Sequence, residues 1–459
     1  MRQNIYVFSI YKKFFLYDYR KNIIIELYEK TYDVLNRYIQ EKEMNQQEEK
    51  LLEKIFEYQD IVEDELVISE EKVAYLSFAP VYGCNFRCTY CFGKYGYNYS
   101  GIERKFDDES LMEILDYFFY KIYPNMEQYR IDFVSGGEPL LGFDIIKKTV
   151  EYVHEFYKKT NKEVSVWLCT NGSLLSEEIC KYLSDNKVSI GISLDGVKSK
   201  NDNNRKDIYG NGTYDLVTNN ISNLLRNKNL TKKFRNIWGL SVAYDENINL
   251  VEILKEYNRI GIPNAQIRLV RDGKVHNIKA IINAYSELTE FLISEFKNGN
   301  LKYFYMILND NDQYGKILRR IILNKVITKR CNAGRNKITI CPDGTVYPCD
   351  SFVGNEKFIM GNIYEGKLLC SKIEKLDIFT IDKCKECNIK FLCGGDCYYN
   401  SFLKNGEISN PDKEFCIIQK HILDNCIYLC YLLEKTDKKL FEELRKGTIF
   451  RDEYFKQYG

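Results

Sequence analysis

The chain has 459 residues, 45 % of them hydrophobic, and its 66 Lys and Arg nearly balance its 65 Asp and Glu. A chain of this length and composition is expected to form two or three domains with substantial cores, which excludes a largely disordered protein. A formal net charge of +1 provides no basic field, so we expect neither a nucleic-acid partner nor an anionic membrane partner.

The first twenty residues carry charges within every apolar stretch, and no apolar run approaches the roughly 18 residues of a membrane span. We therefore expect no signal peptide and a cytoplasmic protein. The sixteen cysteines are then informative. Disulfides are rare in the cytosol, and spaced cysteines in a cytosolic chain more often bind metal.

The first domain is expected to end near residue 70. Short runs of β-branched and aromatic residues predict three strands, at 5–10, 14–19 and 23–27, separated by turn-like YKK and RKN. Two helices follow, near 28–40 and 48–58, the first with an apolar face at helical spacing.

The second domain is expected over residues 71–300, where strands and helices alternate. Such repeated units predict a parallel sheet, because parallel strands need crossover connections. Six units suit an open, partial (β/α)6 barrel in an α/β fold. The six strand-like runs are at 73–79, 130–134, 163–168, 188–193, 238–243 and 265–270.

Four polar loops follow the first four of these strands. They are the cysteine loop 84–91, SGGEP at 135–139, TNG at 170–172 and SLDG at 193–196. In barrels of this kind the loops at the carboxyl ends of the strands carry the function. We therefore expect these four loops to meet at one mouth.

The remainder divides into three segments. Residues 301–330 are expected to be a helical connector. Residues 331–420 are rich in cysteine and turns, so this small domain is expected to rely on metal for its stability. Residues 421–459 are expected to form an amphipathic C-terminal helix, with apolar side chains from Ile422 to Leu433 near one face.

The loop CNFRCTYC holds three cysteines, Cys84, Cys88 and Cys91, with an aromatic residue, Tyr90, before the last. Three thiolates bind three irons of a 4Fe–4S cluster and leave the fourth iron open. This spacing resembles the radical S-adenosylmethionine (radical SAM) superfamily. The resemblance implies that SAM binds the open iron and is cleaved to a 5′-deoxyadenosyl radical. The alternative is a zinc site or a set of free thiols, but a zinc ion would need a fourth ligand nearby.

The same resemblance implies a set of SAM contacts. Gly136, Gly137 and Glu138 would meet the SAM amino group, and Asn171 and Ser193 the ribose or carboxylate. Tyr90, Asp195 and Arg205 are further candidates, with a capped turn or a surface ion pair as the alternative for the last two. The sequence departs from common forms at Ser135, which replaces a frequent glycine or threonine.

Seven later cysteines resemble the SPASM domain, which carries two auxiliary 4Fe–4S clusters, for three clusters in all. The resemblance implies one full ligand set, Cys384, Cys387, Cys393 and Cys416. It implies a second set with three members, Cys331, Cys349 and Cys397. The fourth ligand of that second set is left open between Cys341, Cys370 and a substrate thiolate.

The other candidate residues are expected to be structural. Cys169, Cys180, Cys426 and Cys430 are expected in the core, although Cys169 lies beside TNG. The scattered histidines, His154, His276 and His421, are expected to have surface or structural roles.

The C-terminal segments resemble maturases of Cys-rich ribosomally synthesised peptides, of the ranthipeptide or SCIFF type. That resemblance implies a thioether bond between a Cys sulfur and a carbon of the precursor peptide. The N-terminal strands and helices resemble a winged-helix-like peptide-recognition domain, whose strand edge would accept the leader of the precursor. A reductase such as a flavodoxin or ferredoxin would supply electrons.

Three other functions remain open. A sulfatase-maturing enzyme would oxidise Cys or Ser to formylglycine and would not need a leader-binding domain. A peptide carbon–carbon crosslinker would leave the product thiols free to be alkylated. A non-catalytic iron–sulfur or zinc protein would not cleave SAM.

Overall fold

The computed structural model describes residues 5–57, 72–91, 106–134, 136–234, 237–241, 248–268, 270 and 277–445. Ser135, His276 and the predicted end of the first domain near residue 70 lie outside these ranges. In the described part of the chain, no helix is long and apolar enough to span a membrane.

Within the described residues the main sheet has ten strands, in the order β13-β12-β11-β10-β4-β5-β6-β7-β8-β9. From β4 to β9 the strands are parallel neighbours in chain order, which confirms the predicted α/β parallel sheet. These six strands are β4 (Val73–Phe78), β5 (Gln128–Phe133), β6 (Glu163–Thr170), β7 (Ser189–Ser193), β8 (Ile237–Ser241) and β9 (Asn264–Ile267).

Crossover helices connect the strands, and polar caps mark where several of them begin. Asp107 accepts a hydrogen bond from the Ser110 N–H at the start of α3, and Ser176 caps α5 in the same way. Helix α3 continues as a π-helix over Tyr117–Ile122. The helices are α3 (Asp108–Asp116), α4 (Phe143–Thr160), α5 (Glu177–Asp185), α6 (Lys198–Asn204), α7 (Tyr214–Arg226), α8 (Lys228–Thr231), α9 (Leu250–Ile260) and α10 (Ile278–Lys297).

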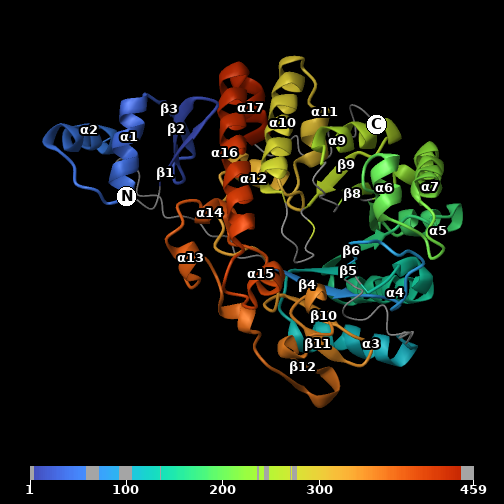
Figure 1. The fold of residues 1–459 in the computed structure, drawn as a ribbon. Coiled ribbons are helices and arrows are strands. Elements are labelled where there is room, and N and C mark those ends of the chain that lie inside the picture. The colour runs from blue at the N-terminus through green and yellow to red at the C-terminus, as the bar shows by residue number, and fades with distance from the viewer. Residues whose placement is uncertain are drawn as a thin grey trace.

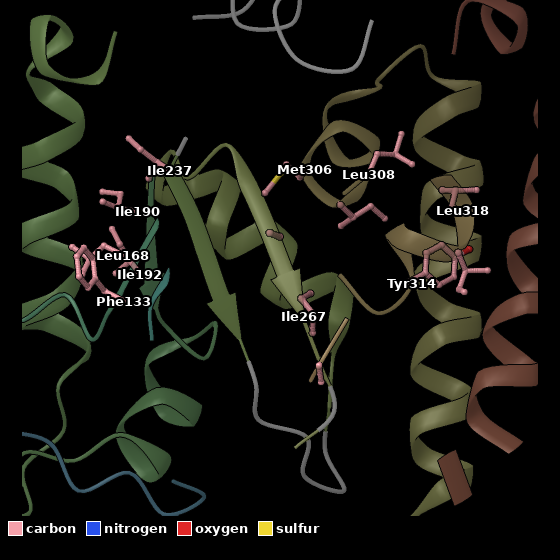
Figure 2. Packing of buried hydrophobic residues seen from close by; sticks show 14 of the residues in the cluster. Phe133, Leu168, Ile190, Ile192, Ile237, Ile267, Met306, Leu308, Tyr314 and Leu318 are labelled. Carbon is pink, nitrogen blue, oxygen red and sulfur yellow. The ribbon is translucent and has the colours of Figure 1, made fainter. Parts of the chain in front are cut away.

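Apolar side chains from the strands and helices form one large core. Figure 2 shows Leu168, Ile190 and Ile192 of neighbouring strands together in this core, with Tyr314 and Leu318 near the C-terminal helices. The region predicted as a connector contains α11 (Lys302–Ile307) and α12 (Gly315–Ile322), and α12 packs against α16.

The Cys-rich segment extends the barrel sheet, which the sequence did not predict. Strand β10 (Lys337–Ile340) pairs in parallel with β4, and the hydroxyls of Ser77 and Thr339 lie 2.7 Å apart across the pair. The remaining elements here are β11 (Thr345–Tyr347), β12 (Gly361–Asn362), β13 (Lys367–Leu368), α13 (Asp382–Lys385), α14 (Lys390–Cys393) and α15 (Tyr398–Asn405).

The C-terminal helix α16 (Lys413–Thr436) begins eight residues before the expected start and so includes Cys416; α17 (Lys438–Arg445) follows it. Asp412 sets this start, because its carboxylate accepts hydrogen bonds from the Glu414 and Phe415 N–H groups. The positions predicted from the sequence for its apolar face are buried: Ile422, Cys426, Leu429, Cys430 and Leu433.

The N-terminal residues form a separate antiparallel sheet, in the order β1-β2-β3, with two helices. One face of the sheet packs on the helices through a small apolar cluster that includes Val7, Leu16 and Leu35. The other face lies beside α16, as Figure 1 shows at the left. The elements are β1 (Ile5–Ile10), β2 (Lys13–Asp18), β3 (Ile23–Leu27), α1 (Glu29–Ile39) and α2 (Gln46–Glu57).

Candidate active site and cysteine groups

The cysteine loop after β4 and the Gly-Gly-Glu turn after β5 are in direct backbone contact. The Glu138 N–H donates to the Gly83 carbonyl at 2.8 Å. A methyl group on Gly137 would stand 2.0 Å from the same oxygen, so only glycine permits this approach. Gly136 has φ +86°, in the left-handed region that favours glycine. Both glycines therefore hold two of the four predicted loops together.

The Glu138 carboxylate is buried and accepts hydrogen bonds from neighbouring groups of the protein. Its Oε1 accepts from the Thr170 hydroxyl at 2.6 Å and from the Leu140 N–H at 3.1 Å, and its Oε2 accepts from the Asn171 N–H at 2.7 Å. Burial raises the pKa of Glu138 to about 7, although these hydrogen bonds oppose the rise. Glu138 thus links the loops after β5 and β6, and its contact with a SAM amino group stays a prediction.

Asn171 lies against the first cysteine of the loop. Its Nδ2 donates to Asn85 Oδ1 at 2.8 Å and stands 3.9 Å from Cys84 Sγ. At the end of β7, Ser193 Oγ lies 4.0 Å from Cys169 Sγ. The TNG and SLDG loops therefore reach the same mouth as the cysteine loop, and Cys169 lies in that mouth.

Tyr90, Asp195 and Arg205 form a trio of side chains that joins the cysteine loop to the SLDG loop. The Tyr90 hydroxyl donates to Asp195 Oδ2 at 2.6 Å, and Arg205 Nη2 pairs with Asp195 Oδ1 at 3.1 Å. The side chains of Asp195 and Arg205 are 0 % and 6 % exposed, so this is a buried pair and not the surface pair considered from the sequence.

Arg205 also faces the loop cysteines. Its guanidinium lies 5.4 Å from the Tyr90 ring centroid and interacts with the Cys88 thiol. Its buried Nε has no hydrogen-bond partner among the described residues. A positive charge beside Cys88 would stabilise thiolates at this site, because it offsets their negative charge.

The three loop cysteines are close enough for their thiols to interact electrostatically. Burial raises the pKa of Cys84 to about 12 and also raises the pKa of Cys88. Thiols bind metal as thiolates, so these buried groups need a metal to compensate their charge. The donor set of Cys84, Cys88 and Cys91 therefore fits an iron–sulfur cluster with one open iron.

The later cysteines come together in two groups. The Cys416 thiol interacts with those of Cys393, Cys384 and Cys387, and we call these four the four-cysteine group. Burial raises the pKa of Cys384 to about 12, and that of Cys416 further. Four thiols in one place fit a fully ligated cluster.

The Cys349 thiol interacts with those of Cys397 and Cys331, and we call these the three-cysteine group. The structure thus brings together the same cysteines that the SPASM resemblance assigns to each cluster. Cys397 lies with Cys331 and Cys349, although Cys393 is nearer to it in sequence. Cys341 is buried just after β10 and Cys370 is exposed. The fourth ligand of this group stays open.

Lys337 is a nearby residue that sequence reasoning missed. Burial lowers its pKa, but Asp350, Asp132 and the thiols of Cys349 and Cys331 raise it by more, so Lys337 is a cation beside the three-cysteine group. The available signal was its place six residues after Cys331, at the start of a short strand-like run.

A site for a single metal ion differs from a cluster site in how close its ligands must lie. In the ranges that the structure describes, no three His, Cys, Asp or Glu side chains are arranged to hold one metal ion. Thiolates on one zinc approach each other to about 4 Å, whereas the cysteines of a cluster each bind a different iron. His154 is exposed, and His421 Nε2 lies 2.9 Å from Ser286 Oγ between two helices, in keeping with the structural roles expected for both.

Comparison with protein families finds two matches. Residues 78–252 match the Radical SAM superfamily, and residues 331–388 match the SPASM iron-sulfur cluster-binding domain. The first match includes all four loops of the mouth. The second includes Cys331, Cys349, Cys384 and Cys387 and ends before the other cysteines of the two groups.

Among curated proteins, the chain is similar to the cysteine-type anaerobic sulfatase-maturating enzyme of Clostridium perfringens. The two are 27 % identical over 344 residues, which cover 69 % of this chain and 86 % of the relative. The serine-type anaerobic sulfatase-maturating enzyme of Bacteroides thetaiotaomicron is 26 % identical, over 73 % of this chain and 85 % of its own.

Two solved structures share the fold. One is anSMEcpe with bound AdoMet, with a TM-score of 0.62 and 23 % identity, covering 79 % of this chain and 99 % of its own. The other is Streptococcus suis SuiB bound to precursor peptide SuiA, with a TM-score of 0.50 and 14 % identity, covering 90 % of this chain and 98 % of its own. At these identities the likeness concerns the fold.

The chain therefore has an α/β radical SAM fold with a parallel sheet, followed by a SPASM domain. These two domains imply SAM and more than one 4Fe–4S cluster as cofactors. The three groups of cysteines described above are the donors that such cofactors need.

Proposed function

We propose that this protein is a radical SAM enzyme that modifies a ribosomally synthesised precursor peptide by joining a Cys sulfur to a carbon of another residue. The observation that carries the proposal is the arrangement of the cysteines. One group of three lies at the barrel mouth, one group of four lies beside α16, and a second group brings three thiols together with its fourth ligand open.

Each group has a role in this proposal. Cys84, Cys88 and Cys91 hold the cluster that binds SAM, and the glycines of the Gly-Gly-Glu turn hold that loop in place. When bound, SAM and its cluster supply the 5′-deoxyadenosyl radical that removes a hydrogen atom from the substrate.

The three-cysteine group would receive the substrate thiol as a thiolate, and the one electron released when its sulfur bonds to the carbon radical would pass to the cluster held there. Cys331, Cys349 and Cys397 leave one ligand to come from outside, which the Cys of the precursor provides. Lys337 offsets negative charge there, which favours the thiolate form of an incoming Cys. A reductase such as a flavodoxin or ferredoxin supplies electrons, and the reaction takes place in the cytoplasm, where thiols stay reduced.

The first experiment tests the radical enzyme itself. Protein reconstituted anaerobically with iron and sulfide should bind about twelve irons, as three 4Fe–4S clusters require. With SAM and dithionite it should release 5′-deoxyadenosine. Zinc in place of iron, with SAM left intact, would refute the catalytic proposal and leave a metal-stabilised scaffold.

Strand β3 is the surface on which we place the leader peptide. It pairs with β2, and no described strand covers its other edge. Ile23 and Ile25 point to one face of the strand and are 44 % and 45 % exposed. A leader added as a fourth strand would bond to the β3 main chain and set alternate apolar side chains against these two residues.

Leader binding can be tested with the short Cys-containing peptide encoded by a neighbouring reading frame, labelled with a fluorophore. Ile25→Asp should weaken its binding at least tenfold in fluorescence anisotropy, because a carboxylate would replace an apolar contact. Leu216→Asp, at a residue 49 % exposed on α7, is the matched control and should bind as the wild type does. Equal binding by both variants and the wild type would place the leader elsewhere.

Formylglycine formation is the second candidate, and the similarity to sulfatase-maturating enzymes favours it. The chemical groups in the product distinguish formylglycine formation from thioether and carbon–carbon bond formation. A formylglycine is an aldehyde that reacts with a hydrazide probe. A thioether removes two hydrogens and one alkylatable thiol, and a carbon–carbon crosslink removes two hydrogens but leaves the thiol.

The two candidates also differ in the peptide they need. A sulfatase-type peptide without a leader should be converted to the aldehyde by a formylglycine-forming enzyme. Turnover of that peptide, with no reaction on the neighbouring Cys peptide, would overturn the thioether proposal in favour of formylglycine formation.

A further inference from the structure

The tyrosine-rich face of the N-terminal sheet packs against α16 and against the segment between Cys387 and Cys393. Tyr6, Tyr17 and Tyr19 all point to this face, and each is at most 1 % exposed. The sheet lies beside α16, which carries Cys416. A face of phenols is unusual where an apolar core would suffice, so the partner of each hydroxyl is informative.

Tyr19 is joined directly to the segment between Cys387 and Cys393. Its hydroxyl donates to the carbonyl of Asn388, the residue after Cys387. Its ring lies 5.9 Å from the Phe391 ring, edge to face, two residues before Cys393. The Tyr19 phenol is also close enough to both thiols to interact with them. One side chain therefore contacts the loop between two proposed ligands.

Tyr6 makes the corresponding contact with α16. Its hydroxyl donates to Asp424 at 2.5 Å, and the Lys420 ammonium lies 5.9 Å from its ring centroid. Tyr6 interacts with the Cys387 thiol as well, and Lys420 faces the same thiol. The sheet thus contacts both elements that supply the four thiols, α16 and the segment from Cys384 to Cys393.

We propose that the N-terminal sheet is the outer wall of the cluster held by the four-cysteine group, and that Tyr19 is the positioning residue that fixes the Cys387 segment. The proposal rests on the ligand role proposed above for these cysteines. Its physical basis is that hydrogen bonding near cluster sulfurs and access of water both set the stability and potential of an iron–sulfur centre.

The domain that would bind the leader is then also part of an iron–sulfur centre. Deleting residues 1–70 would expose the four-cysteine group and release its iron, whatever the substrate. Loss of activity after such a deletion therefore does not report on leader binding, and single substitutions are needed for both questions.

The test compares two phenol-to-phenyl substitutions in the reconstituted full-length protein. Tyr19→Phe removes the hydrogen bond to Asn388 and keeps the ring. Tyr17→Phe is the matched control, because Tyr17 is equally buried on the same sheet but donates to Asn22 Oδ1, at 2.8 Å, and not to the cysteine segment. Each variant loses one hydroxyl and one hydrogen bond.

The readouts are iron transfer to an anaerobic chelator and the midpoint potentials of the clusters, followed by electron paramagnetic resonance. Tyr19→Phe should release about four of the twelve irons roughly fivefold faster, as loss of one hydrogen bond of about 1 kcal/mol gives. It should shift the potential of one cluster only. Tyr17→Phe should match the wild type in both readouts, even if its melting temperature falls equally.

Two results would overturn the proposal, and they differ in what they say about function. If Tyr19→Phe and Tyr17→Phe release iron at the same rate and show the same potentials, the sheet is not a wall of the cluster, although twelve irons would leave the proposed ligands intact. If the wild-type protein itself binds only about four irons, the auxiliary ligand assignment fails, and the wall proposal fails with it.

Discussion

Gly137 offers a sharp test of how the mouth of the barrel is built. In Gly137→Ala the new methyl would stand 2.0 Å from the Gly83 carbonyl oxygen, whereas carbon and oxygen normally approach to about 3.3 Å. The two loops must therefore separate by more than an ångström, which breaks the 2.8 Å hydrogen bond from the Glu138 N–H. The lost hydrogen bond costs about 1 kcal/mol and the overpacking about 1–3 kcal/mol, so we expect destabilisation by about 2–4 kcal/mol.

Anaerobic urea unfolding of the reconstituted protein measures this cost, and the SAM-induced change in its cluster spectrum measures the effect on the loop. Gly83→Ala is the matched control on the other side of the same contact. A methyl on Gly83 would meet nothing within 4 Å, so we expect a change of less than about 0.5 kcal/mol and a normal response to SAM. If the two variants behave alike, the backbone contact is not what holds the loops together.

Two other predictions follow from buried charges. Asp195→Asn leaves the Arg205 guanidinium buried without its carboxylate and should cost about 3–5 kcal/mol in urea unfolding; a loss below about 1 kcal/mol would mean that the pair does not support the loop. Burial raises the pKa of Asp424 to about 7, so the proton is bound more tightly in the folded protein than in the unfolded chain. The contribution of Asp424 to stability should therefore be full below about pH 4 and be lost as the pH rises through about 7, by about 2 kcal/mol between pH 5.5 and 7. Asp424→Asn should remove this part of the slope and leave the part that other buried carboxyls such as Glu138 contribute, and an unchanged slope would contradict the reasoning.

The barrel could be predicted from the sequence because its signals are local. Each strand is a short apolar run followed by a polar loop, and the parallel order follows from the intervening helices. The spacing of the loop cysteines, and Tyr90 before the last of them, identified the kind of site. Grouping Cys397 with Cys331 and Cys349 needed a family resemblance, because spacing in sequence does not report distance in space.

The features that were missed depend on long-range contacts. Nothing local indicates that β10 pairs with β4, since the strand is four residues long and its partner lies about 260 residues earlier. The early start of α16 depends on Asp412, whose capping role could have been read from the sequence. The contact between Tyr19 and Asn388 could not, because a tyrosine on a strand reads equally well as ordinary core.

Helix α16 connects the parts that the proposed reaction must coordinate. It supplies Cys416, it contacts the N-terminal sheet through Asp424, and its buried Gln419 accepts a hydrogen bond from Gln313 at 2.7 Å. The Gln313 N–H in turn donates to the Ile267 carbonyl at the end of β9, on the rim of the barrel mouth.

These contacts fix the distance between the edge of β3 and the barrel mouth, so that no flexible linker sets it. A precursor whose leader is docked on β3 would present its core residues to the mouth as an intramolecular substrate, at an effective concentration set by the spacer between leader and core. The residue that meets the radical is then chosen by spacer length as well as by chemistry. Lengthening the spacer should move the modification along the peptide by the inserted number of residues, as mapped by fragmentation mass spectrometry, whereas a substrate that binds only at the mouth would keep its original site.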